Sequence, residues 1–117
     1  WGIMLNTDGI RFVDEGEDLR NHTYVKFGRE IMKQPDRTAV QIFDQKTIPL
    51  LRDEYRIRQV TKVSGHTIAE LAQGLEINES ALTKTIDEFN AACALGKFNP
   101  SILDDLATRG LNPIKTN

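Results

Sequence analysis

The residues best suited to chemistry lie close together near the start of the chain, between Arg11 and Thr23. Acidic residues within positions 14–18 precede Arg20, and a guanidinium is ordinarily a poor proton carrier because its pKa exceeds about 12. Arg20 could transfer a proton only in a desolvated site, beside carboxylates that return the proton and opposite a developing carbanion. The structural alternative is a strand that runs into a charged loop and a helix N-terminus, with Asn21 or Thr23 as the cap.

Metal and nucleophile chemistry find little support in the other residues. His22 and His66 are far apart and Cys93 is the single cysteine, so the clustered Cys/His spacings of zinc sites are missing and no metal site is expected. No base can be paired with Cys93, so a small buried hydrophobic residue is its favoured interpretation. No strand–glycine–helix sequence that could cradle a phosphate occurs, so the phosphate site of any nucleotide cofactor would lie outside this chain.

Length and composition are those of one compact domain. The chain has 117 residues, of which 39% are hydrophobic and 27% charged, and its formal net charge is -2. This balance does not favour nucleic acid or an anionic membrane as a partner, and no apolar run reaches the length of a membrane span. A single cysteine excludes an internal disulfide and fits a reducing compartment, so a cytoplasmic location is expected.

Hydrophobic spacing predicts interleaved strands and helices. The expected strands are residues 3–5, 10–13, 38–44 and 59–63, and the expected helices are residues 20–33, 45–56, 68–74 and 79–95. Asp8-Gly9 is a strong turn signal, so the first two strands should form a hairpin. Because of this hairpin, an α+β domain with a small mixed or antiparallel sheet packed against helices is favoured over a parallel doubly wound sheet.

The same pattern predicts where helices begin and end and which faces they bury. Thr67 and Glu70 form a capping box and Asn78 is an N-cap, while Pro35, Gly74 and Gly96 should end their helices. The expected buried faces are Tyr24, Phe27 and Ile31 on the first helix and Leu82, Ile86, Phe89 and Cys93 on the last. Residues 97–117 should form a loop that packs against something outside the chain.

Residues 2–15 resemble the start of the capping (clamp) domain of the fumarate reductase/succinate dehydrogenase flavoprotein family. That family has an apolar strand, Asn, a turn with Gly and then Arg-Phe-X-(Asn/Asp)-Glu, followed by an arginine that opens a helix and is matched here by Arg20. Within the family the chain most resembles FAD-dependent tricarballylate dehydrogenases. The matching segments are residues 11–23, 27–31, 41–44 and 51–55, and residues 67–90 also fit the family's order of short helix, turn and long helix.

This resemblance implies that residues 1–117 are a capping-domain fragment, which closes over the FAD of an FAD-binding domain that is absent from this chain. The fragment alone would bind no FAD tightly and would be inactive. Its partners would be that domain and a small polycarboxylate such as tricarballylate. Arg20 would accept a proton while a hydride leaves for the flavin, and His22 and Thr23 would lie near a substrate carboxylate.

Alternatives stay open at this point. The chain could be a free-standing, non-catalytic α+β module that binds a protein, or the cap of a ketosteroid dehydrogenase-like flavoenzyme. The latter enzymes commonly use a tyrosine, and neither Tyr24 nor Tyr55 stands in the expected motif. His22 could equally be a solvated residue at a helix start, and Thr23 could be its cap.

Overall fold

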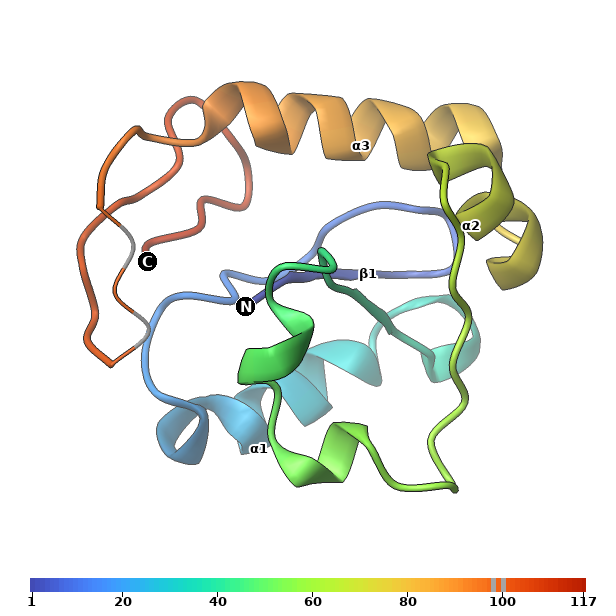
Figure 1. The fold of residues 1–117 in the computed structure, drawn as a ribbon, viewed down its shortest axis with the longest axis horizontal. Coiled ribbons are helices and arrows are strands. Elements are labelled where there is room, and N and C mark those ends of the chain that lie inside the picture. Colours follow the sequence, from blue (N-terminus) through green and yellow to red (C-terminus); the bar gives the residue numbers. More distant parts are fainter. Residues whose placement is uncertain (98, 100) are drawn as a thin grey trace.

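The computed structural model describes residues 1–97, 99 and 101–117, and it confirms the α+β class. Figure 1 shows strand β1 between helix α3 and helix α1. The elements are β1 (Ile3–Leu5), α1 (Arg20–Ile31), η1 (Pro35–Arg37), β2 (Val40–Ile42), η2 (Ile48–Leu50), η3 (Asp53–Tyr55), α2 (Ile68–Leu75) and α3 (Glu79–Ala92), where η marks a 3-10 helix.

Strand β1 pairs with β2 in an antiparallel sheet, so the expected hairpin partner is wrong. The register joins Ile3 to Ile42 and Leu5 to Val40, whereas the expected strand 10–13 contributes one bridge, from Leu5 to Arg11. The chain does turn back after β1, because the backbone N–H of Asn6 donates to the carbonyl of Ile10 at 3.0 Å. The Arg11 side chain is buried, and its Nε donates to the Glu15 carboxylate at 3.0 Å.

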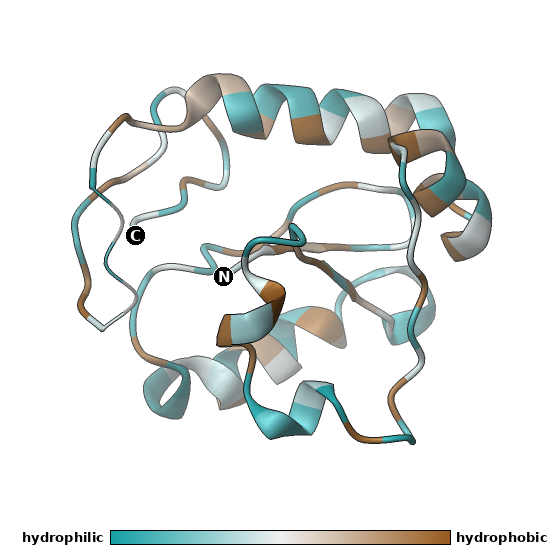
Figure 2. Cartoon of the chain, in the orientation of Figure 1, coloured by the Kyte–Doolittle hydropathy of each residue, from teal (hydrophilic) through white to brown (hydrophobic). Residues whose placement is uncertain are grey.

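The hydrophobic core lies where α2 and α3 pack over β1. Ile3, Leu5, Ala72, Ile77 and Leu82 form one buried cluster, and Leu5 and Leu82 are completely buried. In Figure 2, hydrophobic brown bands mark α2 and the side of α3 that is turned toward the sheet. Burial of a leucine side chain contributes about 1.5–3 kcal/mol, so this cluster is a major source of stability.

Helix α1 begins at Arg20 as expected, but its cap and its buried face differ from the prediction. Asn21 and Thr23 lie inside the helix, and the N-cap residue Leu19 has no side-chain cap bond among the described residues. Thr23 is buried, whereas Tyr24 is 62% exposed. The helix ends at Ile31, two residues before the predicted end, and the backbone N–H of the following Met32 bonds within the last turn.

The caps of α2 and α3 are confirmed, because they depend on neighbouring residues. The Thr67 hydroxyl accepts a hydrogen bond from the Glu70 backbone N–H at 3.1 Å, and the Glu70 carboxylate accepts one from the His66 N–H at 2.7 Å. The Asn78 side-chain oxygen accepts from the Ala81 N–H at 3.0 Å.

The predicted ends of these helices differ from the observed ends by one residue for α2 and by three residues for α3. Helix α2 continues through Gly74, and Glu76 supplies the left-handed residue (φ 57°) that closes it. Gly74 is required for packing instead, because a Cβ atom there would lie 2.5 Å from the Val63 side chain. Helix α3 ends at Ala92, well before Gly96, and Cys93 is exposed rather than buried.

The segment between β2 and α2 contains two 3-10 turns in place of the predicted helix 45–56. Arg56 ties this segment together, since its Nη2 donates to the carbonyls of Pro49 and Leu51, both at 3.0 Å. The described residues 59–63 form no strand, so that prediction is wrong. Val63 packs against Gly74 of α2 and so contributes through its side chain rather than through backbone pairing.

Candidate functional site

Arg20 is the first residue of α1, and its side chain extends toward the neighbouring segment 48–56. The Arg20 Nη1 atom lies 3.6 Å from the Glu54 Oε1 atom of η3, and the two side chains are 54% and 52% exposed. An exposed ion pair of this kind stabilises a protein by no more than about 1 kcal/mol. The Arg20 guanidinium is therefore accessible and free to bind another anion.

Glu54 contacts a second guanidinium on the same surface. Its Oε2 atom lies 3.3 Å from the Arg52 Nε atom. The pKa of Glu54 is lowered, first by a hydrogen bond from its own backbone N–H and then by the charges of Arg52 and Arg20. Glu54 is therefore ionised at neutral pH, and the cluster holds two positive charges against one negative charge.

A buried ion pair fixes the loop that leads to Arg20. The Arg11 guanidinium donates to both carboxylate oxygens of Glu15, from Nε at 3.0 Å and from Nη2 at 2.5 Å. Glu15 also accepts from the Met4 backbone N–H at 2.7 Å, and Arg11 stacks over the Phe89 ring at 5.1 Å. The start of the loop is thereby joined to β1 and to α3.

The C-terminal segment holds the same loop from its other side. The Asp14 carboxylate accepts hydrogen bonds from the N–H groups of Gly16 and Thr116, both at 2.9 Å, and from the Thr116 hydroxyl. The Asn117 side-chain amide donates to the Gly16 carbonyl at 2.7 Å. The expected loop character of residues 97–117 is confirmed for its described residues, and this part of the loop packs within the chain.

The structure does not group His22 with Arg20. The two residues are separated by about 200° of rotation around α1, because successive residues turn by roughly 100°. The His22 Nδ1 atom lies instead 3.0 Å from the Asp18 Oδ2 atom, and its ring is exposed. His22 therefore occupies a solvated position at the start of the helix.

Thr23 is also separate from the charged cluster. Its side chain is buried, and the residue is 3% exposed. The Thr23 hydroxyl donates to the Leu19 carbonyl at 3.5 Å, a long bond within the first turn of α1. In this structure Thr23 supports the helix start, and a substrate-binding role for it stays a prediction.

Arg52 and Glu54 were not identified as functional residues from the sequence, although they lie in a segment that carries the family resemblance. The contact that positions them is aromatic: the ring of Tyr55 packs edge-on against Phe43, with 5.4 Å between centroids. Phe43 directly follows β2, so this contact attaches η3 to the sheet. Their nearness to Arg20 depends on this tertiary packing and has no signal in sequence spacing.

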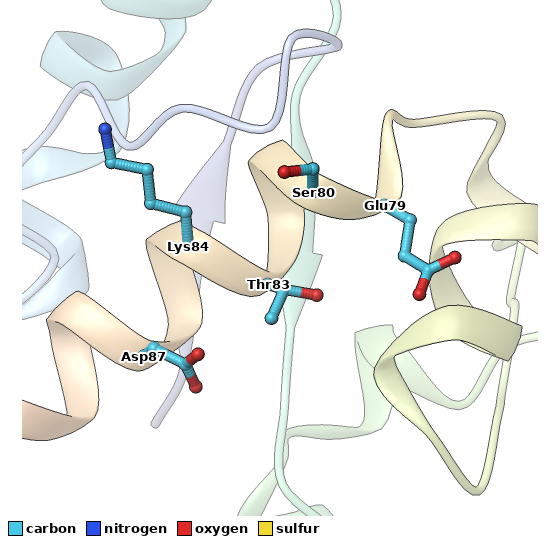
Figure 3. A pocket seen from close by; sticks show the side chains of 5 residues that line it. All are labelled: Glu79, Ser80, Thr83, Lys84 and Asp87. Carbon is cyan, nitrogen blue, oxygen red and sulfur yellow. The ribbon is translucent and has the colours of Figure 1, made fainter.

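Surface hollows occur elsewhere in the described part of the chain. One is lined by Glu79, Ser80, Thr83, Lys84 and Asp87, all from α3. Figure 3 shows that these side chains point in different directions, with Lys84 turned away from Glu79. Side chains that do not converge offer no polar constellation for a small ligand, so we do not place the functional site there.

A metal site and a membrane-spanning helix both lack support within residues 1–97, 99 and 101–117. Their His, Cys, Asp and Glu side chains form no group of three that could hold a metal ion. No helix in this part of the chain is both long enough and apolar enough to cross a bilayer.

The sequence comparison points to the class of fumarate reductases, which are oxidoreductases. One matching protein is the probable fumarate reductase Ifc3 of Shewanella frigidimarina (strain NCIMB 400), which is 32% identical to this chain over 98 residues. The match covers 81% of this chain but 16% of that relative, so the chain spans a small part of the relative's length. No family model matches the chain. No solved structure matches it either.

Proposed function

We propose that this chain is the substrate-capping part of a longer FAD-dependent oxidoreductase that oxidises a small polycarboxylate such as tricarballylate. The observation that carries the proposal is the exposed cluster of Arg20, Glu54 and Arg52, whose net positive charge suits a substrate carboxylate. The similarity of most of the chain to a probable fumarate reductase supports a flavoenzyme of this class.

In this reaction, two hydrogens leave neighbouring carbons of the substrate and a carbon–carbon double bond forms. FAD, held by a separate domain, would take the hydride and its electron pair. Arg20, in its neutral form, would take the proton from the adjacent carbon and become the charged guanidinium. Because a guanidinium has a very high pKa, this neutral form becomes accessible only after the docked domain excludes water from the half-exposed Arg20 side chain.

The proposal can be tested in the full-length protein that carries this segment. Wild type, Arg20→Lys and Arg20→Ala would be compared by the flavin absorption spectrum and by anaerobic flavin reduction on adding tricarballylate. We expect both variants to retain FAD and to reduce it at least about 10²–10⁴-fold more slowly, because a positioned proton-transfer group contributes about that much.

Arg29→Ala is the matched control, because Arg29 is an exposed cation near the other end of the same helix. It should reduce FAD at the wild-type rate. Near wild-type reduction in the Arg20 variants would show that this segment acts only as a lid. Wild-type protein without FAD would favour the alternative of a non-catalytic interaction module.

That alternative is compatible with one observation, the exposed apolar side chains of α1 and of the two residues that flank it. Leu19, Tyr24, Val25 and Met32 are each about half exposed or more. Exposed apolar side chains fit a protein partner as well as a docked FAD-binding domain. The FAD content of the full-length protein separates the two functions.

A further inference from the structure

We infer that Glu54 and Arg52 complete the Arg20 site: Glu54 positions the Arg20 guanidinium, and Arg52 is a second cation that binds a carboxylate of the substrate. This inference rests on the proposed function. It assigns the recognition of a di- or tricarboxylate to residues of η3 and its preceding residue, which the family resemblance does not single out as site residues.

The arrangement of the three side chains supports a shared role. Glu54 uses one carboxylate oxygen for Arg20, at 3.6 Å, and the other for Arg52, at 3.3 Å. A single carboxylate thus lies between two guanidiniums on one surface. Without Glu54, the like charges of Arg20 and Arg52 would repel each other and the two side chains would separate.

The cluster also retains unused hydrogen-bond donors. Each guanidinium carries five N–H donors, and the 3.6 Å separation between Arg20 and Glu54 exceeds hydrogen-bond length. Arg52 contacts Glu54 through its Nε, and its two terminal nitrogens carry further N–H donors. Two cations and one anion leave one net positive charge, which matches one additional carboxylate.

The backbone that carries Glu54 and Arg52 is held by contacts on both sides. Arg56 binds the carbonyls of Pro49 and Leu51, and the Tyr55 ring packs against Phe43. These contacts fix the backbone of η3, which carries Glu54. A rigid support of this kind keeps binding groups in a productive geometry.

The test uses the full-length FAD-containing protein, with tricarballylate as the probe. Anaerobic flavin reduction would be followed over a range of tricarballylate concentrations in wild type, Arg52→Gln and Glu54→Gln. For Arg52→Gln we expect the concentration for half-maximal rate to rise about 10- to 100-fold, since a charged hydrogen bond is lost. Its limiting rate should stay within about threefold of wild type, because binding and not proton transfer is changed.

Glu54→Gln should change the limiting rate more than the half-saturating concentration, as expected of a positioning residue. Its limiting rate should fall about tenfold or more, because a misplaced proton acceptor slows the chemical step. Arg58→Gln is the control, since Arg58 is an exposed arginine of the same segment. This control should match wild type in both parameters.

Arg52→Lys separates an effect on substrate binding from an effect on folding, because it keeps the positive charge and loses only the paired N–H donors of the guanidinium. It should show a smaller rise in half-saturating concentration than Arg52→Gln. Equal half-saturation in Arg52→Gln, Arg58→Gln and wild type would overturn the inference while leaving the proposed function intact. Wild-type protein that binds no FAD, or whose FAD no di- or tricarboxylate reduces, would overturn both.

Discussion

Arg11 and Glu15 form a buried, bidentate ion pair in the loop between β1 and α1. Both Glu15 oxygens are engaged, and the side chains of the two residues are almost inaccessible. A buried pair contributes little against a hydrophobic replacement, but loss of one partner leaves an uncompensated charge. This pair therefore stabilises the path of the loop that leads to Arg20.

Removal of one member of this pair should strongly destabilise the fold. We expect Arg11→Gln and Glu15→Gln each to lower the free energy of unfolding by about 3–5 kcal/mol, measured by urea denaturation. The control is Lys33→Gln, which breaks the exposed pair with Glu30 and should change stability by no more than about 1 kcal/mol. Equal effects in the two pairs would contradict the structural role of Arg11.

Truncation of Leu82 tests how much the core between α3 and the sheet contributes to the free energy of unfolding. Leu82 is completely buried, so Leu82→Ala should cost about 2–5 kcal/mol of unfolding free energy through lost burial and a cavity. Leu95 is fully exposed, and Leu95→Ala should stay within about 0.5 kcal/mol of wild type. A small effect at Leu82 would mean that α3 does not pack as described.

Asp14 should make the fold sensitive to acid. Burial by itself would raise the pKa of Asp14, but hydrogen bonds from Thr116 and Gly16 and the charge of Lys115 outweigh burial and lower it. Because the folded pKa lies below the unfolded value, this stabilisation is fully present above about pH 4 and is lost as pH falls through the folded pKa.

The acid effect can be isolated with Asp14→Asn. Its free energy of unfolding should lie below that of wild type at pH 7, and the difference should shrink as pH falls below about 4. Asp87→Asn, an exposed substitution on α3, serves as the control and should follow wild type throughout. A constant difference between Asp14→Asn and wild type at every pH would exclude the ionised carboxylate as the cause.

The N-cap of α3 provides a test of local helix stabilisation. The Asn78 side chain satisfies the Ala81 N–H, so Asn78→Ala should lower the free energy of unfolding by about 0.5–2 kcal/mol. Asn78→Ser should retain most of the stability, because serine is a comparable cap. Asn90→Ala, an exposed substitution late in α3, is the matched control. A loss at Asn90 as large as that at Asn78 would argue against capping.

Local interactions explain which elements could be predicted from the sequence. The caps at Thr67 and Asn78 join residues three positions apart, so α2 and α3 were recognisable at their starts. Their ends were less predictable, because Gly74 is needed for its close contact with Val63 rather than for its backbone conformation. Alternation at residues 59–63 resembled a strand, but alternation does not supply a pairing partner.

By itself, the sequence determined the α+β class, the starts of the three α-helices and the segments that become β1 and β2, because these depend on short-range periodicity and capping. Only the tertiary structure decided that β1 pairs with β2, that Arg11 binds Glu15 inside the fold, and that Glu54 lies beside Arg20. The partners in the sheet and in the Arg20 site are distant in sequence. Their pairing depends on the packing of all the intervening chain, as the contact of Tyr55 with Phe43 shows for η3.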